Sequence, residues 1–568
     1  SGRFGNWLEN LVDWNLSRSR FWGTPLPIWR TEDGDQELCI GSVSELKTEV
    51  EKAVEAGFMK TNPLGNFIPG DTSETNYHTF DLHRPFVDDI VLVSADGRPM
   101  YRETDLIDVW FDSGAMPYAQ YHYPFEHSKP LESYFPADFI AEGVDQTRGW
   151  FFTLHAIASL LFDSKAYKTC VSNGLVLDKS GNKMSKRLGN TVDPFKTIET
   201  YGADATRWYM ITNSQPWDNL KFDIAGVAEV QRKFFGTLYN TYAFFALYAR
   251  IDKFTYKEAE ISPEERPEID RWILSELNTL IRFVDDSYND YEPTRAGRAI
   301  SDFVNEHLSN WYVRLSRRRF WKGDYTTDKI SAYQTLYRCL EVVAQLISPV
   351  APFFAERLFI DLNTVTRRYD MDSVHLTGFP EADISMIDKD LEERMELAQK
   401  ISSMVLSIRK KINIRVRQPL NRILLPVQEK LMQEQINSVK GLILSEVNVK
   451  ELEYITGIAG ILVKRIKPDF KKLGPRYGKL MKALASAIAT LDQEDINRLE
   501  ADGELKFPVE GEEVVIILDD VEIISEDIPG WQVANLGNLT VALDVTITPE
   551  LWREGIAREL INRIQNLR

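Results

Sequence analysis

Cysteine is scarce in this sequence: only Cys39, Cys170 and Cys339 occur among 568 residues, and no two of them lie near each other. A structural zinc site needs closely spaced cysteine or histidine ligands, and a disulfide scaffold needs paired cysteines. The scarcity therefore excludes a disulfide-rich secreted module and predicts that no structural zinc is bound. It also favours a reducing compartment, so we expect a cytoplasmic protein.

Long apolar runs are also missing, since no stretch of about 18 residues is free of polar side chains. We therefore expect no transmembrane helix and no membrane partner. No signal peptide opens the sequence, and it contains no internal repeat or long low-complexity tract. With 43% hydrophobic and 27% charged residues, the composition is typical of a globular chain of about three to five domains.

Positive charge is in deficit, because 67 lysines and arginines face 85 aspartates and glutamates, for a net charge of −18. Taken over the whole chain, this balance argues against a nucleic acid partner. Two local clusters depart from it. Residues 311–321 interleave aromatic side chains with four arginines, and residues 464–482 hold eight basic residues against one acidic residue. Because salt screens charges beyond about 8 Å, either cluster could still contact RNA phosphates.

The simpler interpretation of the first cluster stays open. Its aromatic side chains could belong to the core, and its arginines could pair with the many carboxylates of the chain. For Trp311 we expect this interpretation to hold. The basic run 464–482 could likewise be a solvated surface.

The stretch 141–189 carries the pattern around which the rest of the sequence is organised. Residues 138–141 resemble the buried end of a strand, and residues 150–158 have the pattern of the helix that follows. Ligands of α/β sheets bind at the carboxyl ends of strands. The polar residues of this junction, Glu142, Asp145 and Gln146, are therefore candidate binding residues.

A second apolar strand, predicted at residues 171–177, leads into a loop with Lys183 and Lys186 between Gly181 and Gly189. Two ammonium groups on a glycine-flanked loop suit a mobile clamp for a phosphoryl group. A lone lysine pair is more often a solvated turn. The junction about one βαβ unit upstream favours the clamp.

Several motifs resemble one family. Residues 183–187, Lys-Met-Ser-Lys-Arg, resemble the KMSKS signature of class I aminoacyl-tRNA synthetases, with Arg187 in place of serine. Residues 142–151 resemble the junction of the isoleucine enzymes rather than that of the valine or leucine enzymes. Residues 14–27, 104–114 and 201–208 match further family segments. By this resemblance, which runs through nearly the whole chain, the sequence is identified as a member of the isoleucyl-tRNA synthetase family.

The resemblance implies ATP-dependent activation of L-isoleucine and its transfer to the tRNA for isoleucine. The expected partners are ATP, L-isoleucine and this tRNA, with Mg²⁺ accompanying ATP and no protein-bound metal, and we expect a monomer. The implied roles are catalysis by Lys183 and Lys186; ATP binding by Lys186, Met184 and Ser185; binding of the isoleucyl adenylate by Glu142, Asp145, Gln146, Trp150 and Trp110; and tRNA binding by Arg314, Arg317, Arg318 and Arg319.

Alternatives stay open at this point. The chain could come from a valine or methionine enzyme of the same class, although residues 145–150 disfavour both. It could act in isolation as a tRNA-binding module without catalysis. An unrelated helical scaffold with a chance Lys-Met-Ser-Lys is disfavoured by the other motifs.

The expected fold class is multidomain, α/β plus all-α. Apolar residues recur every three or four positions from residue 224 onward, which predicts helices at 269–291, 293–320, 329–346 and 352–362, and later at 388–412. The expected domains are the C-terminal half of a Rossmann-like class I catalytic domain with the KMSK loop (1–30 and 86–223), a connective insertion (31–85), an anticodon-binding helical bundle (224–384), and a small α+β C-terminal domain (385–568).

The family's other signature, HIGH, has no match here, because none of the seven histidines forms a His-x-Gly-His pattern. We therefore expect this sequence to lack the first half of the nucleotide fold and the editing domain. We expect the chain on its own not to activate isoleucine. The last predicted helix reaches Arg568 with no glycine or proline to stop it, so we also expect the C-terminal domain to continue.

Overall fold

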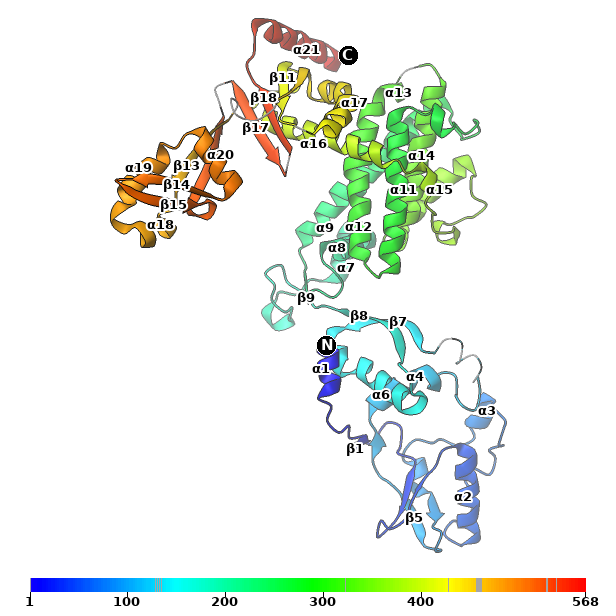
Figure 1. Cartoon of the computed structure of the whole chain (residues 1–568). Helices are drawn as coiled ribbons and strands as arrows, with labels where there is room; N and C mark the ends of the chain where they lie inside the picture. The colour runs from blue at the N-terminus through cyan, green and yellow to red at the C-terminus, as the bar shows by residue number, and fades with distance from the viewer. Residues whose placement is uncertain are drawn as a thin grey trace. The chain divides into compact units, whose positions relative to one another are not determined.

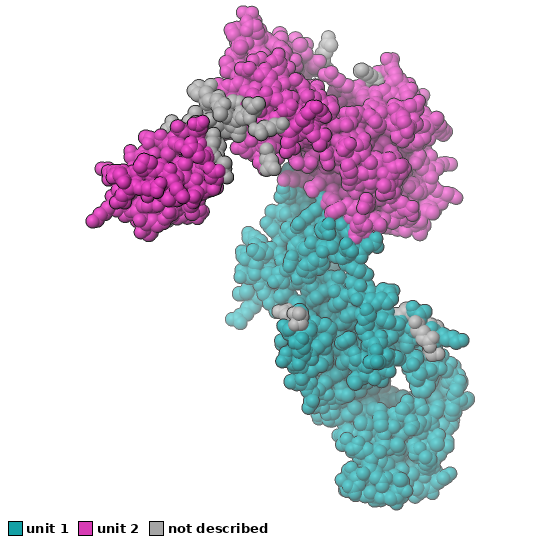
Figure 2. All heavy atoms as spheres, viewed as in Figure 1, with its two compact units in different colours: residues 1–232, 287–298 teal, residues 233–286, 299–568 magenta. Residues whose placement is uncertain are grey.

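The computed structural model describes residues 2–567 except 128, 130, 132, 134, 322, 428, 456–461, 528–529 and 538. Figure 1 follows the chain from α1 to α21. The chain divides into two compact units, which Figure 2 colours separately. The first unit holds residues 1–232 and 287–298, and the second holds residues 233–286 and 299–568.

A four-stranded antiparallel sheet forms the early part of the first unit. Its strand order is β3-β2-β5-β4, with β2 at Ile28–Thr31, β3 at Glu37–Cys39, β4 at Val91–Val93 and β5 at Pro99–Arg102. Helix α2 (Val43–Glu55) packs on it and begins at Ser42, whose side chain accepts a hydrogen bond from the Glu45 N–H. Strand β4 begins only at Val91, because Phe86–Asp89 before it form a 3₁₀ turn.

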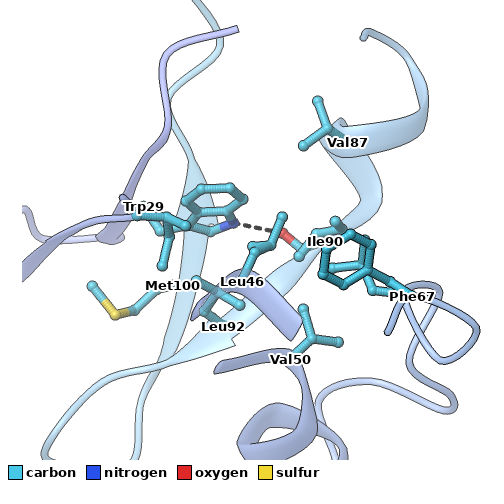
Figure 3. Close-up of a cluster of buried hydrophobic side chains, with 10 residues drawn as sticks. Trp29, Leu46, Val50, Phe67, Val87, Ile90, Leu92 and Met100 are labelled. Carbon is cyan, nitrogen blue, oxygen red and sulfur yellow. Dashed lines mark hydrogen bonds between the residues drawn. The ribbon is translucent and has the colours of Figure 1, made fainter. Parts of the chain in front are cut away.

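One apolar core joins this sheet to α2, as Figure 3 shows. Trp29 of β2 is fully buried there, and its indole N–H donates to the Ile90 carbonyl at 2.9 Å. Leu46 and Val50 of α2 pack with Leu92 of β4. The predicted insertion (31–85) therefore shares its core with residues outside it, namely Trp29 of β2 before it and Leu92 of β4 after it.

A strand–helix–strand unit follows. Strand β7 (Ala137–Gly143) runs parallel to β8 (Tyr167–Asn173), and helix α6 (Trp150–Phe162) connects them. Helix α4 (Val109–Ala119) packs closely on α6, because a Cβ at Gly114 would lie 2.9 Å from the Thr153 carbonyl oxygen. Parallel strands with a helical crossover are the local pattern of a nucleotide-binding fold, as the sequence predicted.

The first helix, α1, spans Arg3–Glu9, and Asn10 ends it. Residues beyond it include Val12, Asp13 and Asn15, which form helices poorly. The Trp14 indole N–H instead donates to the Asp108 carboxylate at 2.9 Å.

The rest of the first unit is mostly helical. Short strands β9 (Val176–Leu177) and β10 (Leu220–Lys221) pair in parallel, while β1 (Ser17–Arg18) and β6 (Leu106–Ile107) pair antiparallel. Helices α7 (Pro194–Tyr201), α8 (Ala203–Asn213) and α9 (Ile224–Val230) follow. Residues 287–298 also belong here, and the Thr294 hydroxyl donates to the Ile211 carbonyl at 2.7 Å.

The second unit opens with long helices, as the 3.6-residue periodicity predicted. They are α10 (Gly236–Asp252), most of α11 (Glu268–Asn289), α13 (Arg314–Trp321), α14 (Thr327–Ile347), α15 (Pro352–Thr366) and α16 (Lys389–Lys411). Helix α12 (Pro293–Asp302) begins in the first unit and ends in the second. Figure 1 shows several of them side by side in green and yellow. The helix expected at 293–320 is continuous but changes its winding, because Phe303–Val313 is a π-helix between α12 and α13.

A mixed sheet of order β12-β11-β18-β17 forms the next part. Strands β11 (Leu420–Leu425) and β12 (Val449–Tyr454) are parallel and joined by helix α17 (Lys430–Val447). Strands β17 (Trp531–Leu536) and β18 (Leu539–Asp544) form an antiparallel hairpin. Arg409 of α16 is buried beside this sheet, and its guanidinium donates to three backbone carbonyls, those of Arg415, Gln418 and Asn448.

A small α+β cluster lies between β12 and β17 in sequence. Strand β13 (Leu462–Pro468) pairs with β16 (Val521–Asp527), and β14 (Glu504–Val509) pairs with β15 (Glu512–Ile517). Helices α18 (Phe470–Tyr477), α19 (Met481–Ala489) and α20 (Gln493–Asp502) complete it. The basic run 464–482 falls here, where Lys472 pairs with Asp519 and Arg476 with Asp520.

The predicted last helix is α21 (Pro549–Leu567), and the Thr548 hydroxyl caps it by accepting from the Leu551 N–H. Most of its apolar stripe, including Trp552, Ile556 and Leu560, is exposed. Within the described ranges, no helix combines the length and apolarity that crossing a membrane requires.

Candidate functional site

The turn after β7 brings three of the predicted site residues close to Gly149: Gln146, Trp150 and Trp110. The Trp150 indole N–H donates to the Ser113 carbonyl of α4 at 2.9 Å, and the Trp150 backbone N–H donates to the Gln146 side-chain carbonyl at 3.1 Å. A Cβ at Gly149 would lie 3.2 Å from the Trp110 ring and 2.8 Å from the Gln146 side-chain oxygen. Trp110 and Gln146 therefore both lie against this glycine, and the absence of a side chain there permits the arrangement.

Asp145 and Glu142 are the acidic groups of the junction, and both are exposed. The Gln146 amide donates to the Asp145 carboxylate at 2.8 Å. A Cβ at Gly143 would lie only 2.6 Å from the same carboxylate, so this glycine also makes room for it. Glu142 is the last residue but one of strand β7 and lies opposite Ser172 of β8. Its exposed carboxylate stands at the carboxyl end of a parallel strand, where ligands of α/β sheets bind.

Asp108 connects three segments of this region through its carboxylate. Its carboxylate accepts from the Arg18 guanidinium at 2.7 Å and from the Trp14 indole at 2.9 Å, and it caps α4 through the Trp110 N–H. A cavity of ≈ 230 Å³ lies here, lined by Asp108, Trp110 and Arg148 among others. A larger cavity of ≈ 580 Å³ lies between the four-stranded sheet and α4, but none of the predicted site residues lines it.

The predicted phosphate loop is a braced turn. Asn190 holds it at three points: its amide donates to the Asp178 carboxylate at 2.9 Å and to the Lys183 carbonyl at 3.2 Å, and its side-chain oxygen accepts from the Ser185 N–H at 2.9 Å. The Asp178 carboxylate also accepts from the backbone of Ser180 and Asn182. Donation from Asn190 is the main reason that the pKa of Asp178 lies below its usual range.

Lys183 and Lys186 project from this turn and are exposed, while Met184 and Ser185 are partly buried. The Ser185 hydroxyl accepts from the Leu188 N–H and starts a short 3₁₀ turn that Lys186 opens. In the part of the chain that the structure describes, no hydrogen bond or ion pair joins either lysine to the Trp110 junction. The ammonium groups of Lys183 and Lys186 are therefore exposed to solvent, on a loop whose backbone is held by hydrogen bonds.

The four predicted tRNA-binding arginines have different environments. Arg319 is engaged by carboxylates, since its guanidinium makes a bidentate pair with Asp270 and also bonds Asp328. Arg314 pairs with Glu446 and lies 5.6 Å over the buried Trp311 ring. Arg317 and Arg318 are exposed on α13.

Sequence reasoning missed the residues that support the site. Asn190, Asp178 and Gly149 carry no charge pattern or periodicity that marks them as structural braces. A partial signal exists for Asn190, because it lies four residues after the Lys-Met-Ser-Lys motif and asparagine often bonds the backbone of turns. Residues 2–567, outside the gaps given above, contain no cluster of three or more metal-ligating side chains.

Two family models match the chain. The model for tRNA synthetases class I (I, L, M and V) matches residues 1–223, and the model for the anticodon-binding domain of tRNA ligase matches residues 270–424. Over its whole length the chain is 66% identical to an isoleucine–tRNA ligase of Bacteroides fragilis. The chain is therefore similar over its whole length to isoleucine–tRNA ligases. It spans about half the length of the curated relatives that it matches, since it covers 50% of this one.

A more distant relative is also an isoleucine–tRNA ligase. An isoleucine–tRNA ligase of Clostridium novyi is 41% identical over all of this chain and 52% of its own length. Among solved structures, a leucyl-tRNA synthetase of Agrobacterium radiobacter K84 matches with a TM-score of 0.46 and 19% identity, over 66% of this chain and 43% of that one. The identity to isoleucine enzymes favours this branch over the valine and methionine alternatives.

Proposed function

We propose that this chain supplies the phosphate-binding loop, one wall of the amino-acid pocket and the tRNA-binding helices of an ATP-dependent isoleucine–tRNA ligase. The loop 178–190 is the observation that supports this most strongly. Asn190 bonds the loop backbone at Lys183 and Ser185 and bonds the Asp178 carboxylate, so Lys183 and Lys186 are presented from a defined turn with free head groups. A clamp for a transferring phosphoryl group needs this combination of fixed backbone and available charge.

The proposed reaction has two steps. An oxygen of the isoleucine carboxylate attacks the α-phosphorus of ATP, the bond to the bridging oxygen breaks, and pyrophosphate leaves with the electron pair. The terminal ribose hydroxyl of the tRNA then attacks the activated carbonyl carbon, and AMP leaves. No covalent enzyme intermediate forms, so the protein contributes position and electrostatic stabilisation. Mg²⁺ accompanies the ATP phosphates and partly neutralises them.

Within this reaction we assign Lys183 and Lys186 to the phosphates, with Met184 and Ser185 shaping the nucleotide side of the loop. Trp110 and Trp150 form apolar walls for the isoleucine side chain. Their position is fixed by Gly149 and by the bond from Trp150 to Ser113.

The acidic and amide groups of the junction suit the polar end of the amino acid. Glu142 is exposed at the end of β7, where its carboxylate can accept from the α-ammonium group of the adenylate. Asp145 and Gln146 are joined by a hydrogen bond, so they act as one polar unit toward the amine or the ribose.

On the helical half we assign Arg317 and Arg318 to tRNA phosphates, because both are exposed on α13. Arg314 and Arg319 lie beside them but are paired with Glu446 and Asp270. We therefore expect these two arginines mainly to hold the shape of the tRNA-binding surface, and to contact tRNA only at the edge of that surface. We further propose that the protein is a monomer. We also propose that it works in the cytoplasm, which agrees with its three free cysteines.

The test of the phosphate assignment uses a protein of the relatives' full length. Lys186→Ala should lower the rate of isoleucine-dependent pyrophosphate exchange about a hundredfold with little change in the KM for isoleucine. The reason is that the Lys186 ammonium group stabilises negative charge that develops on the phosphates in the transition state. Lys179→Ala, an exposed lysine just outside the motif, is the matched control and should leave the rate unchanged. A raised KM with an unchanged rate constant would refute the assignment.

A tRNA-binding role without catalysis is the second candidate for the chain taken alone. The match to an anticodon-binding domain over residues 270–424 favours it. Filter binding of the tRNA for isoleucine and of a non-cognate tRNA to the 568-residue chain tests it, and pyrophosphate exchange by the same preparation separates it from catalysis.

A further inference from the structure

Asp108 is a buried carboxylate that directly precedes α4, the helix that carries Trp110. It is 3% exposed, and a charge buried to this extent needs partners. Its Oδ2 oxygen accepts from the Arg18 guanidinium at 2.7 Å and from the Trp14 indole N–H at 2.9 Å. Its backbone N–H donates to the Leu16 carbonyl at 2.7 Å. Asp108 is therefore tied to that earlier segment of the chain by three hydrogen bonds.

The other carboxylate oxygen of Asp108, Oδ1, faces the helix. It accepts from the Trp110 backbone N–H at 3.3 Å and so caps α4. A cap fixes the first turn of a helix, and Trp110 is the second residue of that turn. Trp110 is 41% exposed, and its ring lies 3.2 Å from the place that a Cβ at Gly149 would take. Because neighbouring side chains cover only part of this ring, its position depends on the backbone that Asp108 holds.

The second tryptophan of the proposed pocket is attached to the same helix. The Trp150 indole N–H donates to the Ser113 carbonyl of α4 at 2.9 Å. Helix α4 also lies tightly on α6, since a Cβ at Gly114 would be 2.9 Å from the Thr153 carbonyl oxygen. The middle of α4 is therefore fixed by packing, and Asp108 fixes its first turn. Both tryptophans take their places relative to this one helix.

From these contacts we infer that Asp108 is a positioning residue for amino-acid selection, which sets the place of Trp110 and so the width of the isoleucine pocket. This inference rests on the proposed function, in which Trp110 is a wall of that pocket. Asp108 acts through the tryptophan and does not touch the amino acid. One methylene in an apolar pocket is worth roughly 10–200-fold in selectivity, a rule for which isoleucine enzymes are the standard example. A displaced wall should therefore lose part of the preference for isoleucine over valine, which is one methylene smaller.

The test measures pyrophosphate exchange of a full-length protein with isoleucine and with valine. Asp108→Ala should lower the ratio of the two kcat/KM values about tenfold, through a raised KM for isoleucine, while the KM for ATP stays the same. This ratio does not depend on the fraction of enzyme that is folded, so a loss of stability alone leaves it unchanged.

Two further variants complete the set. Trp14→Phe keeps an aromatic ring and the Arg18 pair but removes one bond to the carboxylate, so it tests the same link with a smaller change. It should lower the ratio about threefold. Asp223→Ala is the matched control, because Asp223 caps α9 in the same way, by accepting from the Ala225 N–H. It should leave the ratio unchanged.

Trp110→Leu in the same assay separates this inference from the proposed function. If Trp110→Leu leaves the ratio at the value of the parent, the pocket assignment of Trp110 fails, and the inference fails with it. If Trp110→Leu lowers the ratio but neither Asp108→Ala nor Trp14→Phe does, the inference is overturned while the pocket assignment stands. The double variant Asp108→Ala, Trp14→Phe should be no less selective than Asp108→Ala, because the bond is already lost. A decrease equal to the product of the two single effects would also overturn the inference.

Discussion

The guanidinium of Arg319 holds the carboxylate of Asp270 in a bidentate pair, with Nη1–Oδ1 at 2.6 Å and Nη2–Oδ2 at 2.8 Å. Asp270 is fully buried, and the hydroxyls of Tyr312 and Ser331 donate to it as well. The pair joins α11 to α13 inside the helical bundle. Three consecutive arginines of α13 thus divide into one that stabilises the fold and two, Arg317 and Arg318, that face solvent.

Arg319→Ala should destabilise the protein strongly. It leaves the buried Asp270 charge without its partner, and removing one member of a buried ion pair costs about 3–5 kcal/mol. Arg317→Ala and Arg318→Ala should change stability by no more than about 0.5 kcal/mol, as exposed substitutions do. Urea unfolding monitored by circular dichroism measures both. An Arg319→Ala protein as stable as the parent would show that the pair contributes little.

Arg317 and Arg318, the two exposed arginines of α13, are the ones that we expect to contribute to tRNA binding. The double variant Arg317→Ala, Arg318→Ala should weaken tRNA binding and reduce the slope of log affinity against log salt by up to about 2, since each phosphate contact contributes about 0.7–0.9 to it. Filter binding between 50 and 300 mM salt gives the slope. Arg271→Ala, Arg282→Ala, two exposed arginines of α11, serve as the control for loss of net charge. An unchanged slope would remove these arginines from the interface.

Stability should fall as pH rises from about 5 to 8 because of Glu276 on α11. Burial, together with the charge of the neighbouring Glu392, raises its pKa to about 7. The folded state therefore keeps a proton that the unfolded state releases near pH 4.5, so deprotonation on the folded side costs stability across this window. At about 1.4 kcal/mol per pKa unit, the loss should be about 2–3 kcal/mol.

Glu276→Gln should remove most of that pH dependence, and it should be more stable than the parent at pH 8. Denaturant unfolding at several pH values measures the effect. Glu434→Gln, at an exposed carboxyl on α17, should keep the slope of the parent. A pH dependence that survives in Glu276→Gln would assign it to another group.

Asn190→Ala should loosen the phosphate loop, because three hydrogen bonds that brace it are lost. The amide of Ser185 should exchange with deuterium about tenfold faster, and in a full-length protein the rate of pyrophosphate exchange should fall while the KM for isoleucine stays similar. Asn182→Ala is the control, since that side chain makes only a 3.5 Å contact with Asp178. Unchanged exchange at Ser185 would contradict the bracing role.

Gly149→Ala should disturb the tryptophan wall. The new methyl group would lie 2.8 Å from the Gln146 side-chain oxygen and 3.2 Å from the Trp110 ring, so one of them must move. We expect a loss of about 1–3 kcal/mol in stability, as for overpacking, and a raised KM for isoleucine in a full-length protein. Gly441→Ala, in helix α17 with open space around it, should be neutral or stabilising. A neutral Gly149→Ala would show that the junction adapts freely.

Local pattern in the sequence was enough to predict much of this protein. The apolar periodicity predicted α11, α14, α15 and α16 to within a few residues, because it records which face of each helix is buried. The loop around Lys183 and Lys186 was predicted because Gly181 and Gly189 flank it, and glycine disfavours regular structure. The junction before α6 was predicted because an apolar strand end at 138–141 precedes a helical pattern at 150–158.

Only the tertiary structure decided which side chains meet. Asp270 lies 49 residues from Arg319 in sequence, and no local pattern distinguishes Arg319 from its two neighbours. The same holds for Asn190 and Asp178, and for Trp110 against Gly149, whose contacts depend on how separate elements pack. Helix periodicity fixes the face of a residue relative to its own helix, whereas burial, pairing and pKa depend on which other element covers that face.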